Sequence, residues 1–217
     1  MNTDLLLLAD GRFPSGGHAH SGGLETAVAR GRVTDLDDLR AFLLGRLRTA
    51  GLVAAAFAAA ACARPEAMEE LEDELAARTP SPALRLAARR QGRSLCRAAL
   101  VVWPGEHVTR AAAARVAQPI ALGVAAHAAG LGPEAAALMA AYHAISGPAS
   151  AAVRLLGLDP YRVHAVLAEL GDACDDVARE AATHARGPIG DLPAASAPLL
   201  DVSAEDHAAW EVRLFAS

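Results

Sequence analysis

Two histidines within a glycine-rich run near the N-terminus are the residues of this chain best suited to chemistry. They lie in the segment RFPSGGHAHSGGLE, residues 12–25, which contains four glycines, two serines and the histidines His18 and His20. Glycine pairs cost conformational entropy on folding, so they persist where the backbone must adopt conformations that other residues avoid. The pattern predicts a loop shaped for binding a phosphate, a metal ion or another protein.

The phosphate hypothesis is the weakest of the three. Backbone amides at a helix N-terminus bind phosphate, but a P-loop also needs a lysine after its glycines. The 217-residue chain contains no lysine, and Glu25 in the first turn of the following helix would repel an anion. A dinucleotide fingerprint would need a preceding strand and a different spacing than Gly16, Gly17, Gly22 and Gly23 provide.

The metal hypothesis depends on His18 and His20, which face the same way only if the backbone between them is extended. A stable zinc site has three or four ligands, and the chain has neither a cysteine pair nor a His-Glu-x-x-His helix. We therefore expect no cofactor and no firm metal site. A transient nickel or zinc contact at the two histidines stays open, and with it the alternative of a helical metal-binding enzyme that uses this loop.

A nucleophile and base would be Ser15 or Ser21 beside His20. Serines in glycine-rich turns usually hydrogen-bond the backbone, and no third group that would orient the histidine can be named from spacing. The acidic run at 69–74 is typical of a solvated helix face. The chain is therefore expected to have no enzymatic activity.

Composition bounds the remaining function classes. The formal net charge is −5, so no general basic field favours nucleic acid. Cys62, Cys96 and Cys174 are odd in number and far apart, which favours reduced thiols and a cytoplasmic protein. The longest apolar run, residues 52–63, is about twelve residues long, whereas a membrane span needs about twenty. The N-terminus lacks the basic start of a secretory signal, so we expect no membrane association.

Alanine-rich, aromatic-poor composition and helical periodicity predict an all-α fold. We expect a single-domain bundle of about eight to ten helices with a short C-terminal helical tail. Thr34 followed by Asp37 resembles a capping box that opens the first long helix. The expected long helices cover 34–63, 66–78, 82–102, 118–130, 133–157 with a kink at Pro148, and one continuous helix from 160 to about 181.

The helical periodicity of the sequence ends after Arg186. Residues 187–202 contain prolines and glycines without periodicity, which predicts a flexible linker. Ser203 with Asp206 is expected to cap a tail helix over 203–217. The whole chain, 1–217, is expected to form one domain to which this tail is attached.

Five blocks of sequence resemble one known family. The opening Leu-Leu-x-x-Ala-Asp-x-x-Phe-Pro-x-Gly-Gly-x-x-His-Ser-x-Gly-Leu-Glu is similar to the start of the UreF family of urease accessory proteins. Arg85-x-Ala-x-x-Gln-Gly-Arg-Ser-Leu, Pro119-Ile-Ala-Leu-Gly-Val-Ala-Ala and the stretch from Tyr142 to Leu156 resemble its later helices. The C-terminal Arg213-Leu-Phe-Ala-Ser resembles the end of the family's sequences.

The resemblance implies an all-helical, dimer-forming scaffold without catalysis of its own. Its implied partners are a UreD/UreH-like accessory protein, a UreG-like GTPase and apo-urease, in an assembly that couples GTP hydrolysis to nickel insertion. It also implies that the GTPase is recruited at the position of His18, where the family commonly has an aromatic residue, and at Arg213. With neighbouring His20, these residues form the expected recruitment site.

Glycine loops suit close approach by a partner, and an apolar tail on a linker suits ordering on binding. The loop and the tail are therefore the expected partner-binding surface. Besides the recruitment residues it comprises Gly16, Gly17, Ser21, Gly22, Glu25, Trp210, Leu214 and Phe215. For Trp210 and Phe215, packing onto the chain's own core is an equally good expectation.

Overall fold

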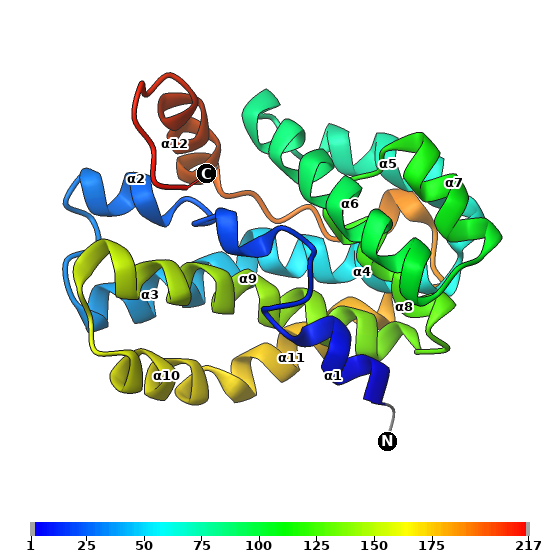
Figure 1. Cartoon of the computed structure of the whole chain (residues 1–217), viewed down its shortest axis with the longest axis horizontal. Coiled ribbons are helices and arrows are strands. Elements are labelled where there is room, and N and C mark those ends of the chain that lie inside the picture. The colour runs from blue at the N-terminus through cyan, green and yellow to red at the C-terminus, as the bar shows by residue number, and fades with distance from the viewer. Residues whose placement is uncertain (1–2, 216–217) are drawn as a thin grey trace.

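The computed structural model describes residues 3–215, except for the side chain of His18, and these residues confirm the all-α prediction. They form helices and connecting turns and contain no strand (Figure 1). The helices are α1 (Thr3–Ala9), α2 (Leu24–Ala29), α3 (Leu36–Arg46), α4 (Leu52–Ala63), α5 (Met68–Ala77), α6 (Pro82–Val102), α7 (Glu106–Ala114), α8 (Gln118–Ala128), α9 (Pro133–Leu156), α10 (Pro160–Glu169), α11 (Gly171–Thr183) and α12 (Pro198–Ala208).

Helices α3 and α4 are joined by a π-helical turn at Leu47–Gly51, which keeps the chain helical throughout the expected range. The start differs by one residue from the expected capping box. Asp35 is the N-cap and accepts a hydrogen bond from the Asp38 amide at 2.9 Å. The Asp38 carboxylate accepts in return from the amide and hydroxyl of Thr34. The box therefore pairs Asp35 with Asp38, because aspartate caps a helix as well as threonine does.

The centre of the bundle is α4, which packs against α8, α9 and α11 (Figure 1). Small residues allow these helices to approach closely. A Cβ on Gly123 of α8 would lie 2.3 Å from the carbonyl oxygen of Ala58 in α4, which leaves no room for any side chain. The three cysteines are free and buried, as expected of small core residues, and burial raises each thiol pKa to about 11.

The joined helix Leu36–Ala63 has 28 residues and is long and apolar enough to cross a membrane by length and composition. Its apolar character has another cause in this fold. Residues such as Ala55, Phe57 and Ala59 of α4 are completely buried between the surrounding helices. Core helices of globular proteins are apolar on all faces for this reason.

The prediction of one continuous helix from 160 to about 181 was wrong. The chain bends at Leu170 and Gly171, which separates α10 from α11 (Figure 1). The apolar stripe continues across the bend because both helices pack on α9, and Leu170 itself is buried at the corner. Periodicity reports the buried face and not the straightness of the helix axis.

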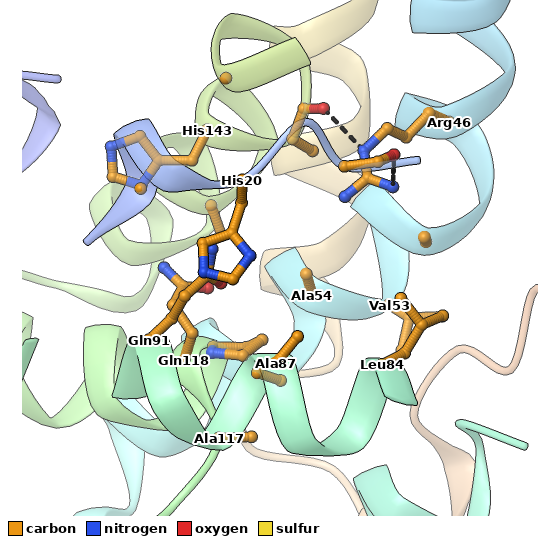
Figure 2. Close-up of a pocket in the computed structure, with 18 of the residues that line it drawn as sticks. His20, Arg46, Val53, Ala54, Leu84, Ala87, Gln91, Ala117, Gln118 and His143 are labelled. Carbon is orange, nitrogen blue, oxygen red and sulfur yellow. Dashed lines mark hydrogen bonds between the residues drawn. The ribbon is translucent and has the colours of Figure 1, made fainter. Parts of the chain in front are cut away.

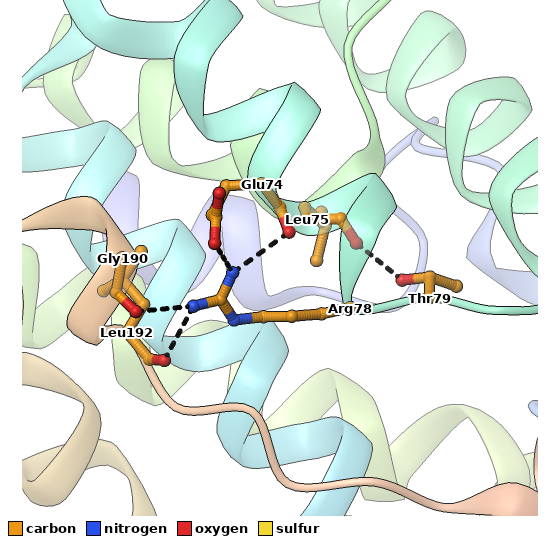
Figure 3. Close-up of polar contacts among 6 residues, drawn as sticks. All are labelled: Glu74, Leu75, Arg78, Thr79, Gly190 and Leu192. Atoms are coloured by element: carbon orange, nitrogen blue, oxygen red, sulfur yellow. Dashed lines mark hydrogen bonds and ion pairs between the residues drawn. The ribbon is translucent and has the colours of Figure 1, made fainter.

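The C-terminal elements also differ from the prediction. The last helix, α12, begins at Pro198 and ends at Ala208, so Ser203 lies inside it and caps nothing. The expected linker packs onto the bundle, with Ile189 and Leu192 buried. Figure 3 shows how Arg78 at the end of α5 holds this segment.

The guanidinium of Arg78 donates to the carbonyl oxygens of Gly190 at 3.0 Å and Leu192 at 3.2 Å. It also donates to the backbone oxygen of Glu74 and forms an ion pair with the Glu74 carboxylate (Figure 3). These contacts fix the path of the chain toward α12. A proline-rich composition without periodicity thus corresponds here to an irregular but docked segment.

Candidate functional site

The glycine-rich loop leads into α2, whose N-cap is Gly23, and Ser21 lies two residues before that cap. The buried Ser21 hydroxyl accepts a hydrogen bond from the Glu25 amide at 3.2 Å, and the Ser21 carbonyl accepts from Leu24. Hydrogen bonding to the nearby backbone is the usual role of serines in such turns. Ser21 is therefore satisfied by the backbone in this structure.

Gly22 must be glycine for two reasons. Its φ is +61°, and a Cβ at this position would lie 2.9 Å from Cγ of Pro148 and 3.0 Å from Cζ of Arg46. Arg46 donates to the carbonyl oxygens of Gly22 at 2.9 Å and Ala144 at 3.0 Å, so one guanidinium joins the loop to α9. Desolvation lowers the pKa of Arg46 to about 10, which leaves it charged at neutral pH.

The next glycine brings the loop against the C-terminal helix. Gly23 has φ of +90°, and a Cβ there would lie 2.9 Å from Cδ2 of Leu200 in α12. The two glycine pairs thus differ in role. The second pair allows the loop to pass between α9 and α12, whereas Gly16 lies beside Ser94 of α6 and Gly17 begins a turn of 3-10 helix.

Glu25 joins the loop to the C-terminal tail. Its carboxylate accepts hydrogen bonds from the backbone amides of Leu214 at 2.8 Å and Phe215 at 3.1 Å. It also contacts Nε2 of His207 in α12 at 2.9 Å. All of these partners lie more than 180 residues away in sequence. We call Glu25, His207 and the tail residues 210–215 that surround them the loop–tail junction.

The contact with Glu25 orients the ring of His207. Carboxylates only accept hydrogen bonds, so Nε2 of His207 carries the proton that points to Glu25. Nδ1 of the same ring is buried and has no hydrogen-bond partner among the described residues. Hydrogen bonds from three donors to one buried carboxylate are strong ones, because the acceptor is charged.

Aromatic contacts complete the loop–tail junction. The Phe215 ring is buried, and the guanidinium of Arg154 in α9 lies over it at 4.5 Å from the centroid. The Trp210 ring lies 5.0 Å from that of His207. In this conformation Phe215 packs onto its own chain, one of the two outcomes expected for it.

Helix α12 is attached to α2 on one side. Arg30 forms an ion pair with Asp206 at 2.6 Å, and Thr26 donates to the backbone oxygen of Ser203 at 3.4 Å. The Arg30 hydrogen bond holds the pKa of the Asp206 carboxyl below its usual range.

A second attachment joins α12 to the start of α6. Glu205 accepts from the Ala83 amide at 2.9 Å and from the hydroxyl of Ser81, the N-cap of α6. These hydrogen bonds, that from Ser81 above all, lower the pKa of Glu205. The tail helix therefore lies between α2 and α6, at one end of the bundle (Figure 1).

The loop–tail junction presents part of the tail to solvent. Val212 and Leu214 are 82% and 73% exposed, and Arg213 between them is also exposed. The Arg213 side chain forms no ion pair or hydrogen bond with any residue within 3–215. Exposed apolar side chains around a free cation are typical of a protein-binding surface.

A cavity of about 400 Å³ lies between the loop and the bundle. Figure 2 shows His20 reaching from the loop toward Gln91 of α6 and Gln118 of α8. His143 of α9 also lines the cavity, and burial lowers its pKa, so it is neutral at pH 7. His20 thus belongs to the inner side of the loop.

The structure does not test the transient metal contact that the sequence left open for His18 and His20. In the described part of the chain no group of three or more His, Cys, Asp or Glu side chains is placed to hold a metal ion. The side chain of His18 lies outside the described residues.

The structure brings the predicted loop and tail residues together and sorts them by exposure. Arg213, Leu214 and Gly16 are on the surface, whereas Ser21, Glu25 and Phe215 are buried at the loop–tail junction and can support a partner contact without touching the partner. Sequence reasoning missed Arg46, His207 and Arg154. Their contacts join residues that are far apart in sequence, and such long-range partners give no local signal.

Comparison with known proteins identifies relatives of this chain. The UreF family model matches residues 33–171. A urease accessory protein UreF of a Mycobacterium species, strain JLS, is 48% identical over 215 residues, covering 99% of this chain and 98% of that protein. The urease accessory protein UreF of Mycolicibacterium vanbaalenii is 49% identical over 98% of this chain and 97% of its own length. That of Mycobacterium tuberculosis strain H37Rv is 43% identical over 94% and 92%.

Proposed function

We propose, from the premise that the chain belongs to the UreF family of urease accessory proteins, that it is a non-catalytic scaffold in urease maturation. It links a UreD/UreH-like accessory protein to a UreG-like GTPase on apo-urease and regulates GTP-dependent nickel insertion. It acts in the cytoplasm, as a homodimer within the complex, and carries no cofactor of its own.

The observation that supports this proposal best is the display of Arg213 by the loop–tail junction. Glu25 holds the amides of Leu214 and Phe215, and Phe215 is buried below Arg154. The backbone around Arg213 is therefore fixed, while its guanidinium remains available to a carboxylate of a partner. Because this backbone is already ordered, binding has to order only the Arg213 side chain, which lowers the entropy cost and favours a recruitment role.

The loop supports the same role from the other side of the junction. The loop that carries His18 and His20 leads into α2, and Glu25 in the first turn of that helix reaches the tail. One partner can therefore contact the loop and the tail together. The buried residues of the junction supply the rigidity and the exposed residues supply the contacts.

The test is recruitment of the cognate UreG-like GTPase by a complex of this protein with the cognate UreD/UreH-like protein. We expect Arg213→Ala to weaken GTPase binding at least tenfold without changing the free energy of unfolding. Arg162→Ala is the matched control, since Arg162 is also exposed and lies on the distant helix α10. Unchanged binding by Arg213→Ala, or no binding of either partner by the unaltered chain, would contradict the proposal.

A further inference from the structure

Helix α6 carries an unusual concentration of positive charge. Its 21 residues include five of the chain's 20 basic residues and no acidic residue, although the chain as a whole has a net charge of −5. The five arginines are Arg85, Arg89, Arg90, Arg93 and Arg97.

Three of these arginines lie on a single exposed stripe. Arg90, Arg93 and Arg97 are separated by three and four residues, which places them on one face of the helix within about 10 Å along its axis. The same spacing adds Leu86, 50% exposed, and Val101, 82% exposed, at the two ends. We call these five residues the α6 stripe.

The arginines of the α6 stripe have no ion pair within the part of the chain that the structure describes. Their neighbours Arg89 and Arg85 are different. Arg89 pairs with Glu72 of α5 at 2.8 Å, and Arg85 donates to the carbonyl oxygens of Thr79 and Pro80. Arg85 and Arg89 therefore stabilise the fold through contacts within the chain, while the arginines of the α6 stripe are exposed to solvent.

Such a stripe is unfavourable for the helix that carries it. Like charges three or four residues apart repel and destabilise a helix, and no acidic residue in α6 compensates for them. An isolated fold gains nothing from this arrangement. A carboxylate-rich partner would remove the repulsion and form charge-assisted hydrogen bonds with the guanidinium groups.

The position of the α6 stripe connects it with the loop. Ser94, next to Arg93, lies under Gly16, where a Cβ would be 3.4 Å from the Ser94 hydroxyl. At its N-terminal end α6 also contacts α12 through Ser81 and Glu205 (Figure 1). The stripe is thus continuous with the surface that carries the loop.

We propose that the α6 stripe binds an acidic segment of a protein partner, with carboxylates on Arg90, Arg93 and Arg97 and apolar side chains on Leu86 and Val101. The short length of the basic stripe and the negative net charge favour a protein over nucleic acid, whose backbone charge requires a broad basic surface. The apolar ends add the buried area that protein interfaces have and that a simple counter-ion site lacks.

The proposal rests on the proposed function for the identity of the partner, which is one of the urease-maturation proteins. The experiment measures binding of the purified UreD/UreH-like protein, UreG-like GTPase and apo-urease to the full chain. The salt concentration is varied from about 50 to about 500 mM, because salt screens exposed charges. A labelled peptide of glutamate and leucine, compared with its glutamine counterpart, is a probe that does not depend on the proposed function.

We expect the double variant Arg93→Glu with Arg97→Glu to bind one of the three partners or the glutamate peptide at least tenfold more weakly. The remaining binding should depend less on salt. The milder pair Arg93→Gln with Arg97→Gln should have the same effect to a smaller extent, and it serves if the reversal impairs folding. Arg162→Glu on α10 is the matched control and should change nothing.

Partner and peptide binding that is unchanged in both double variants would overturn the proposal. The proposal would also be overturned if the double variants lost binding only to DNA or to anionic vesicles. If the unaltered chain binds none of the three proteins, the proposed function fails, and the peptide comparison alone decides about the α6 stripe. The two ideas can therefore fail separately.

Discussion

The loop–tail junction and the α6 stripe are both charged, but their charges are used in opposite ways. In the junction, the buried Glu25 carboxylate has three donors from the chain itself. In the stripe, Arg90, Arg93 and Arg97 are exposed and have no ion pair within residues 3–215. The difference separates charges that fold the molecule from charges available to a partner.

This contrast gives each region its own expected response to mutation. Removing a buried charge that is fully hydrogen-bonded leaves its donors unpaired, which is costly. Removing an exposed and unpaired charge costs the fold little and affects only binding. The following substitutions test the contrast.

The largest effect is expected for Glu25→Ala. The substitution leaves the amides of Leu214 and Phe215 and Nε2 of His207 without an acceptor. We expect a loss of about 3 kcal/mol in the free energy of unfolding, measured by chemical denaturation. Glu180→Ala, at an exposed position on α11, should stay within about 0.5 kcal/mol. If Glu25→Ala destabilises the fold no more than this control does, the buried Glu25 carboxylate does not stabilise the fold as proposed.

A smaller loss is expected for Gly22→Ala, because both φ and space are unfavourable. The positive φ alone costs an alanine about 1 kcal/mol, and the added Cβ would also press on Pro148 and Arg46. We expect about 2 kcal/mol in total. Gly31→Ala is the matched control, since Gly31 has φ of +65° with nothing within 4 Å of the added Cβ. Equal effects of the two substitutions would show that the close approach at Gly22 is unimportant.

Acid should loosen the attachment of α12. The folded-state pKa values of Glu205 and Asp206 lie below their ordinary values of 4.5 and 3.8, so both carboxylates stabilise the fold at higher pH. This contribution is complete above the ordinary values and is lost as the pH falls below them through the lowered ones. The stability difference between the unaltered chain and Glu205→Gln with Asp206→Asn should therefore shrink from pH 6 toward about pH 3. A difference that is constant with pH would contradict this assignment.

The smallest effect, with the opposite sign, is expected in the α6 stripe. Arg93→Gln with Arg97→Gln relieves like-charge repulsion and should stabilise the fold by a few tenths of a kcal/mol, about the value of a helical charge pair. Arg179→Gln, which removes the exposed pair with Asp176, should cost a similar amount. Thermal unfolding at low salt measures both. If the stripe variant is clearly less stable than the unaltered chain, these arginines contribute to the stability of the fold.

The sequence predicted the elements that depend on local information. Alanine content and helical periodicity predicted the fold class and the helices α6, α8 and α9. Where two neighbouring residues can both cap a helix, the prediction was off by one position: Asp35 caps α3 in place of Thr34. The division between α10 and α11 was missed because a buried stripe can follow the chain around a bend.

The loop–tail junction could be predicted only in part. Glycine density and the family resemblance pointed to the loop and the tail, but not to the bond between them. Glu25 and His207 are 182 residues apart, and an acidic residue in a first helical turn already has a local explanation as a helix-dipole partner. Likewise, nothing near Arg46 in sequence indicates that it reaches Gly22 and Ala144.

Hydrogen exchange at the amides of Leu214 and Phe215 tests the central claim, that Glu25 joins the loop and the tail into one rigid surface. In the unaltered chain both amides should exchange slowly, although they follow the exposed residues Val212 and Arg213. In Glu25→Gln, where one acceptor oxygen becomes a donor, at least one of them should exchange at least tenfold faster while the core amides of α4 keep their protection. Fast exchange in the unaltered chain, or equal protection in the variant, would contradict the account.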